Sequence, residues 1–454
     1  MTPPIAYDAT RLFLGPLSRT PRGIDRVDLA FAEHIFRGHP NALAVLPTPW
    51  GVRCFGPECV LPGLERLRAL WAEATEPEAD AVYLRLRARL LGGPVEREPP
   101  STVGHTFLGD SLRLLSLLRA TGVAPGASVT RAVPQNALYL SIGHLGLVFP
   151  ILLRWLDRRP DVTPVFMLHD AIPIESPEYV EPDGVRGHVR MMDAAARYAR
   201  GLIATTQTAR ASVDGQLAQR GRTPLPAFVR ALPPGDAFTA CPAADLALAD
   251  CSYFIACATL EPRKNLELLG EVWKRLCAEH GALAPHLVIV GAKGWRGDQI
   301  AARLARAPGA ANRLHIVHGL STPALARLLA GARALLSPSF TEGYGLPVVE
   351  ALAVGAPVIA SDIASHREIA RDRVTLVDPL DGPAWKAAIE RAAGQRAHIA
   401  PPRVESWPDY FAAWAQSFEK LRQSPRPPPP QAAAPLAYAC ADPPRILCGK
   451  GGEP

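Results

Sequence analysis

Two glutamates and two glycines share one short segment that could bind a phosphorylated sugar. Glu342 and Glu350 lie eight positions apart within 335–360, and Gly343 and Gly345 follow the first of them. The segment predicts a strand, a loop and then a helix, so the loop lies at the carboxyl end of a parallel strand, where helix N–H groups favour phosphate. Carboxylates accept hydroxyl hydrogen bonds strongly. The alternative is an ordinary loop with two solvated glutamates.

A pair of cations follows another predicted strand. Arg263 and Lys264 stand in the sequence TLEPRKN at 259–265. Arginine offers a two-pronged donor and lysine a compact charge, which together suit a diphosphate. A solvated basic turn is the alternative.

Three further segments with candidate residues follow predicted strands. His169 and Asp170 end a buried strand in the first half of the chain, and a lone histidine there is more often structural. Gly23, in RGIDRV, precedes the first long helix and allows close backbone approach. Gly291, in VIVGAKGW, follows a strand of the second half, and a simple turn is equally compatible with it.

The elements that must position these residues form two α/β series, which predict two doubly wound parallel-sheet domains. The first, at 1–238, contains a helical insertion near 57–130, and the second spans 250–400. A closing helix is expected at 401–423 and a disordered proline-rich tail at 424–454. Strands and helices of the first series are predicted at 5–9, 24–36, 137–141, 150–158, 165–168, 185–199, 202–205 and 208–220. Those of the second are predicted at 253–258, 265–279, 286–290, 298–306, 314–317, 322–330, 334–337, 347–353, 357–360, 365–370 and 374–377.

Composition narrows the class of protein. The 454 residues are 48% hydrophobic, and 49 basic against 43 acidic side chains give a net charge of +6 without basic blocks, which argues against a nucleic-acid partner. The eight cysteines lack metal-binding spacing and indicate free thiols in a reducing cytoplasm. No secretion signal is expected. The uncharged stretch at 135–153 is read as a strand, a glycine-rich turn and a helix, with a membrane span as the alternative.

The segment EGYGLPVVEALAVGAPVIASD resembles the E-x7-E signature of glycosyltransferase family 4, whose members are retaining enzymes of the GT-B fold. TLEPRKN and HD-x-IP are similar to two further family motifs, although Ala258 stands where the family usually has glycine. By this resemblance His169, Glu342 and Asp170 act on the donor sugar, Glu350 binds ribose, and Arg263 and Lys264 bind the diphosphate. The donor-binding backbone would be that of Gly343, Tyr344, Gly345, Leu346, Gly23 and Gly291.

The resemblance implies transfer of a hexose from a nucleotide-diphosphate sugar to a saccharide or lipid-linked acceptor in surface polysaccharide synthesis. GDP-mannose is the first donor hypothesis and a UDP-sugar the second. No cofactor or metal is expected, and the location would be cytoplasmic, with peripheral contact at the inner membrane. A nucleotide-sugar epimerase and a non-catalytic scaffold remain alternatives, whereas a dehydrogenase would need a glycine-rich fingerprint that is not found.

Overall fold

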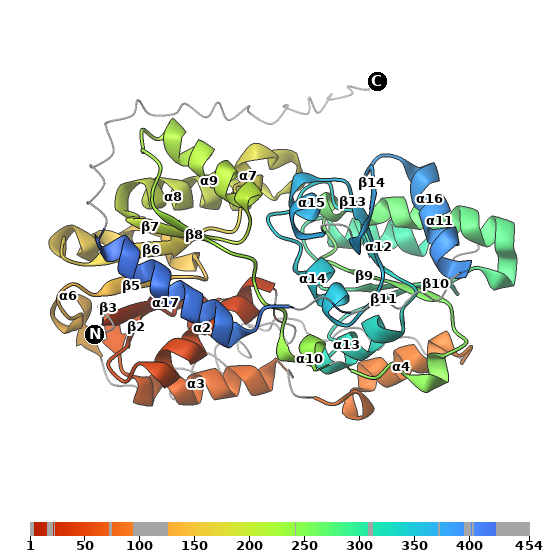
Figure 1. The fold of residues 1–454 in the computed structure, drawn as a ribbon, viewed down its shortest axis with the longest axis horizontal. Coiled ribbons are helices and arrows are strands. Elements are labelled where there is room, and N and C mark those ends of the chain that lie inside the picture. The colour runs from red at the N-terminus through yellow and green to blue at the C-terminus, as the bar shows by residue number, and fades with distance from the viewer. Residues whose placement is uncertain are drawn as a thin grey trace, which may run out of the picture.

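The fold consists of two α/β lobes, each built around its own sheet (Figure 1). The structure is a computed structural model, which describes residues 4–15, 21, 23–71, 75–93, 126–240, 242–306, 312–370, 373–394, 401 and 404–423. Both sheets are formed mainly by parallel strands, which confirms the predicted fold class.

The N-terminal sheet has eight strands in the order β4-β3-β2-β1-β5-β6-β7-β8. Six of them run parallel, namely β1 (Ile5–Asp8), β2 (Leu43–Thr48), β5 (Leu138–Ser141), β6 (Thr163–Met167), β7 (Gly201–Ala204) and β8 (Ala227–Val229). At one edge β3 (Gly51–Phe55) and β4 (Ala127–Ser128) pair antiparallel. β3 also pairs antiparallel with β2, and the hairpin of β2 and β3, whose turn has Gly51 at a φ of 97°, was not predicted from the sequence.

Helices cover both faces of this sheet. The longer ones are α2 (Gly23–Gly38), α3 (Pro57–Leu70), α8 (Pro182–Tyr198) and α9 (Gln207–Gln219). The shorter ones are α1 (Thr10–Leu14), α6 (Val129–Ala132) and α7 (Ile172–Glu175), together with the 3-10 helix Pro150–Arg158. The helix α10 (Asp236–Thr239) follows this sheet in sequence but buries Phe238 in the core of the C-terminal lobe.

The C-terminal sheet has six parallel strands in the order β11-β10-β9-β12-β13-β14. The strands are β9 (Tyr253–Cys257), β10 (His286–Val290), β11 (Leu314–Val317), β12 (Leu335–Ser337), β13 (Val358–Ser361) and β14 (Thr375–Val377). They alternate with α11 (Leu266–His280), α12 (Gly297–Ala305), α13 (Thr322–Gly331), α14 (Leu346–Ala353), α15 (Ala364–Ala370) and α16 (Gly382–Gly394). The strand order reverses between β9 and β12, which is where such sheets bind ligands.

Two helices cross between the lobes. α4 (Ala81–Leu90), from the predicted helical insertion, buries Tyr83, Leu86 and Leu90 in the core of the C-terminal sheet. α17 (Trp407–Gln423) follows the C-terminal lobe in sequence but packs on the N-terminal lobe, where four of its aromatic rings surround Phe31 (Figure 1). Much of the predicted insertion, at 94–125, and the tail at 424–454 lie outside the described residues.

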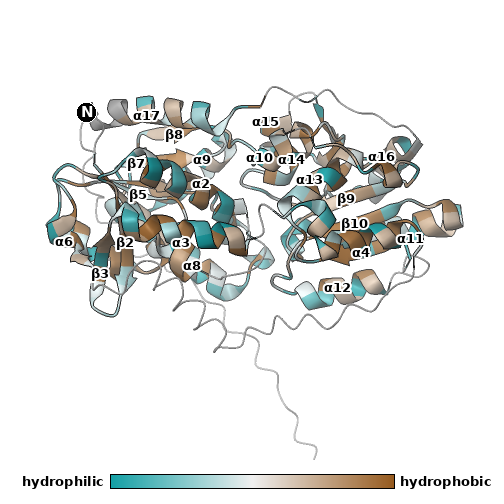
Figure 2. Ribbon diagram, turned by 90° about the horizontal axis from the view of Figure 1, so that it is seen from below, coloured by the Kyte–Doolittle hydropathy of each residue, from teal (hydrophilic) through white to brown (hydrophobic). Residues whose placement is uncertain are grey.

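The apolar segments are concentrated inside each lobe. Figure 2 shows β9 and β10 in hydrophobic colours, and β10 is buried along its whole length. The uncharged stretch at 135–153 contains β5, a turn and the start of the 3-10 helix Pro150–Arg158. Among the described residues, no helix has both the length and the apolar character that crossing a membrane requires.

Candidate functional site

Glu342 lies at the centre of a compact charged cluster. Its Oε2 accepts a hydrogen bond of 2.6 Å from Nη1 of Arg263, while Oε1 accepts one from the ammonium of Lys264 and one of 2.7 Å from Oγ of Ser339. Burial alone would raise the pKa of Glu342, but the charges of Arg263 and Lys264 outweigh it and hold that pKa well below its usual range. Glu342 is therefore an ionised, oriented acceptor.

The turn that carries both cations is bound to the loop that carries the glutamate. The guanidinium of Arg263 donates a hydrogen bond of 3.0 Å to the carbonyl of Thr341. The backbone carbonyl of Arg263 accepts one of 2.9 Å from the amide of Phe340. Asn265, with a left-handed φ of 51°, donates its side-chain amide to the carbonyls of Pro338 and Pro379. The motif at 259–265 thus fixes the geometry of the loop as well as supplying charge.

Gly343 brings the C-terminal loop against the N-terminal lobe. A methyl group built on it would lie 2.5 Å from the carbonyl oxygen of His169 and 2.8 Å from Oδ2 of Asp170, so only glycine fits this approach. The carbonyl of Gly343 accepts a hydrogen bond of 2.9 Å from the buried hydroxyl of Thr206, at the start of α9. His169 and Asp170 therefore face the Glu342 loop across the boundary between the lobes.

His169 is held neutral at pH 7. Burial lowers its pKa to about 4, against the opposing charge of Asp170. Its Nε2 is buried and finds no hydrogen-bond partner in the described part of the chain. A neutral imidazole with an unused nitrogen can donate to, or accept from, a substrate hydroxyl.

Two helix N-termini meet beside this loop. Gly345, at a φ of 98°, turns the chain into α14, and a methyl group on Gly23, the first residue of α2, would lie 3.2 Å from Cδ2 of Leu346. The buried Tyr344 donates its hydroxyl to the carbonyl of Leu232 at 2.7 Å, which anchors the same turn to the N-terminal lobe. The N–H groups of both helices favour an anion here.

Glu350 lies one turn into α14 and is only 1% exposed. Its Oε1 lies 2.9 Å from Nη1 of Arg26, a residue of α2 in the opposite lobe. This pairing between the lobes was not predicted from the sequence.

Packing between two loops requires a glycine at position 291. A methyl group there would lie 1.9 Å from the carbonyl oxygen of Ala258, and one on Gly294 would lie 2.7 Å from the methyl group of Thr259. The two glycines let the loop after β10 pack directly on the loop after β9. The proposed role of Gly291 in donor binding stays a prediction.

The structure thus brings together most of the residues that the sequence singled out, from both lobes. It also adds residues that sequence reasoning missed. Ser339 holds Glu342, Thr206 holds Gly343, and Glu368 accepts hydrogen bonds from the amides of Gln207 and Thr208 at the start of α9. The contacts of Thr206 and Glu368 join segments remote in sequence, whereas Ser339 lies three residues from Glu342 and was the one with a local signal.

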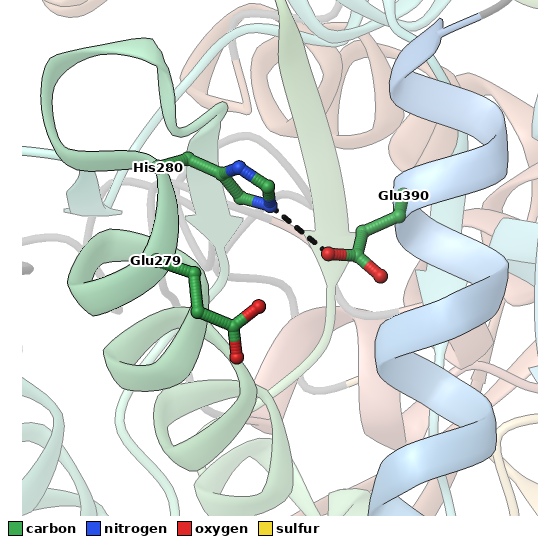
Figure 3. A group of neighbouring side chains, drawn as sticks. All are labelled: Glu279, His280 and Glu390. Atoms are coloured by element: carbon green, nitrogen blue, oxygen red, sulfur yellow. Dashed lines mark hydrogen bonds and ion pairs between the residues drawn. The ribbon is translucent and has the colours of Figure 1, made fainter.

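One group of described side chains has the proximity needed to share a metal ion, namely Glu279, His280 and Glu390 on α11 and α16 (Figure 3). The ammonium of Lys386 already pairs with Glu279 at 2.6 Å and with Glu390 at 2.8 Å. Both helices lie in the outer part of the C-terminal lobe, away from the lobe boundary (Figure 1). This group is separate from the charged cluster at Glu342.

Two parallel-sheet lobes with a charged site at their boundary define the GT-B class of proteins. Residues 247–398, which form most of the C-terminal lobe, match the family model described as Glycosyl transferases group 1, also called family 4. The sequence resemblance is thereby confirmed.

The curated relatives are distant. The serotype-specific mannosyltransferase WbdA of Escherichia coli is 27% identical over 293 residues, which cover 60% of this chain and 35% of WbdA. The O-antigen chain mannosyltransferase B of Escherichia coli is 36% identical over 140 residues, covering 30% of this chain and 35% of that protein. The chain thus spans about a third of the length of the relatives it matches.

Solved structures share the fold. Anabaena Alr3699/HepE, crystallised with UDP and glucose, has a TM-score of 0.55 at 17% identity, and the match covers 93% of this chain and 97% of that one. A trehalose-6-phosphate synthase has a TM-score of 0.51 at 11% identity, covering 92% and 95%. At these identities the likeness is one of fold.

Proposed function

We propose that the chain is a retaining glycosyltransferase that moves a hexose from a nucleotide-diphosphate sugar to a saccharide or lipid-linked acceptor. One observation carries the proposal: the loop of Glu342, a residue held by Arg263 and Lys264, packs through Gly343 against His169 and Asp170 of the other lobe. In the proposed reaction the carboxylate would bind sugar hydroxyls, the two cations would bind the diphosphate, and the neutral imidazole would contact the donor sugar from the other lobe.

The donor we favour is GDP-mannose. The relatives WbdA, O-antigen chain mannosyltransferase B and RfbU are all named mannosyltransferases, and the two latter names place them in O-antigen synthesis. We therefore propose mannosyl transfer in surface polysaccharide synthesis. A UDP-sugar is the competing donor that the experiment below must distinguish.

The reaction would proceed on one face of the sugar. The acceptor oxygen bonds to the anomeric carbon as the bond from that carbon to the phosphate oxygen breaks, and the departing phosphate oxygen takes the proton of the acceptor hydroxyl. Arg263, Lys264 and the N-terminus of α14 would stabilise the negative charge that develops on the diphosphate. This requires no cofactor and no metal. His169 would orient the sugar and stabilise positive charge at the anomeric carbon through its dipole, without acting as the base.

Glu342 pairs with both Arg263 and Lys264. Donor binding would divide this cluster, with the diphosphate taking Arg263 and Lys264 while Glu342 turns to a sugar hydroxyl. The cations are thus held in place before the donor arrives, which limits the reorganisation at the reaction step.

A lipid-linked acceptor would bring the chain to the cytoplasmic face of the membrane. The net charge of +6 favours contact with anionic lipid there.

A panel of nucleotides and nucleotide-sugars, followed by thermal unfolding, tests the proposal. We expect GDP-mannose at about 100 times its Kd to stabilise the fold by about 2.7 kcal/mol, seen as a rise in Tm. If only UDP-sugars raise the Tm, the donor would be a UDP-sugar instead of GDP-mannose, and the proposal of a glycosyltransferase would stand. If no nucleotide-sugar raises the Tm, the proposed function is wrong.

A further inference from the structure

Arg26 reaches from the N-terminal lobe into the C-terminal site. It lies in the first turn of α2, three residues after Gly23, whose backbone contacts the start of α14. Its Nη1 lies 2.9 Å from Oε1 of Glu350, and its guanidinium carbon lies 6.0 Å from the centre of the buried ring of Phe238. The Arg26 side chain is only 20% exposed, so this is no surface ion pair.

The second carboxylate oxygen of Glu350 has no partner of its own. The residue is 1% exposed and both oxygens are buried; Oε1 has the ion pair with Arg26, whereas Oε2 has neither an ion pair nor a hydrogen bond among the residues that the structure describes. A buried carboxylate oxygen without a donor is costly and points to a group that arrives from outside. A ribose hydroxyl, the ligand expected for Glu350, would supply that donor.

We propose that Arg26 is a positioning residue for Glu350, supplied by the opposite lobe: it fixes one carboxylate oxygen and leaves the other for the ligand. This deepens the proposed function and rests on it. Each lobe then holds half of the nucleotide site, because the residue that binds the ligand is oriented by a residue of the other lobe. Nucleotide binding is consequently coupled to the closed arrangement of the lobes.

The electrostatics of the pair agree with this role. Burial raises the pKa of Glu350, and Arg26 lowers it in opposition. In the described part of the chain, Glu350 also interacts with the thiol of Cys257 on β9 and the hydroxyl of Tyr344, and burial raises the pKa of both. Neither supplies a positive charge, so loss of Arg26 would raise the pKa of Glu350 further and let the carboxyl bind a proton at higher pH.

The test is the affinity for GDP, or for UDP if the donor panel selects it, at about pH 6 and about pH 8.5. In Arg26→Met, protonation of Glu350 replaces a charge-assisted hydrogen bond by a neutral one. When the pH is lowered from about 8.5 to about 6, the affinity of Arg26→Met for the nucleotide should fall, and we expect this fall to be about tenfold larger than that of the parent. Ionisation of the phosphate affects both proteins equally, and Arg26→Lys should restore the parent profile. Equal pH profiles in the parent and in Arg26→Met would overturn the proposal.

A second comparison works even if Arg26→Met fails to fold. Glu350→Gln and the double variant Arg26→Met with Glu350→Gln should bind GDP within about twofold of each other, because Arg26 then has no carboxylate to position. If the double variant binds about tenfold more weakly, Arg26 contacts the ligand itself and the positioning role is wrong.

Arg37→Met on the same helix is the matched control, since Arg37 is 56% exposed and pairs with Glu33. If the parent protein binds no nucleotide, the proposed function itself is contradicted. Failure of the proposed function can therefore be told apart from failure of the positioning role of Arg26.

Discussion

Oε2 of Glu342 accepts a 2.6 Å hydrogen bond from Nη1 of Arg263, a residue 79 positions earlier in the chain. The two side chains belong to loops at the carboxyl ends of neighbouring strands, β12 and β9. Burial desolvates both groups, so neither charge is tolerable without the other. This pairing is the reason we expect large effects from single substitutions at the site.

Replacement of Glu342 by glutamine should lower kcat/KM for the donor about 10- to 100-fold, because a charge-assisted hydrogen bond to the sugar is lost. The Tm should also fall, since Arg263 and Lys264 lose a buried anion. Initial rates and thermal unfolding measure both effects. Glu261→Gln is the control: Glu261 also binds Arg263, at 2.8 Å, but is more exposed, and we expect a much smaller change. Equal effects of the two variants would contradict a special role for Glu342.

Lys264→Ala should weaken binding of the nucleoside diphosphate about tenfold and leave the nucleoside alone almost unaffected, because the lysine charge acts on phosphate. Calorimetric titration with GDP and guanosine compares the two ligands. Lys293→Ala removes an exposed lysine that pairs with Asp298 and should change neither affinity. A similar loss for guanosine would place Lys264 away from the diphosphate.

Gly343→Ala should reduce kcat about 100-fold, because the added methyl group would separate the loop from His169 and misplace the reacting groups by up to an ångström or so. Gly215→Ala, inside α9 with open space around the new methyl group, should leave the rate unchanged and raise stability by about 1 kcal/mol. Turnover numbers and unfolding curves report these outcomes. Full activity in Gly343→Ala would mean that the close approach is not needed for the reaction.

His169 should make the folded state less stable as the pH falls. Its pKa of about 4 in the folded state is lower than the ordinary value of about 6.5, so between these values the unfolded chain binds more protons. In His169→Asn, the dependence of Tm on pH should become shallower in this window, though not flat, because burial also lowers the pKa values of His286 and His315. His280→Asn, at an exposed position, serves as the comparison. An unchanged slope in His169→Asn would show that His169 is not buried as a neutral group.

The sequence predicted the parallel sheets well because buried strands and amphipathic helices have short-range patterns. It also singled out Glu342, Arg263 and Lys264, which the structure brings into one cluster, since strand ends and loop motifs are local features. The hairpin of β2 and β3 escaped prediction because it adds antiparallel strands at the sheet edge, with a proline inside one strand.

Contacts between residues far apart in the sequence could not be predicted from local sequence patterns. The approach of Arg26 to Glu350 joins residues in different lobes, and nothing in the surroundings of either residue indicates its partner. The same holds for α4, whose apolar face packs on the C-terminal core although the helix belongs to the first half of the chain.

The most direct test of the central claim is a transfer assay with GDP-mannose and a methyl α-mannoside acceptor, read by proton NMR of the product. We predict release of GDP together with a new glycoside that keeps the α configuration of the donor, and loss of both in Glu342→Gln. A product of inverted configuration would contradict the same-face mechanism, and release of nucleotide with no glycoside from any donor and acceptor tested would contradict the assignment as a transferase.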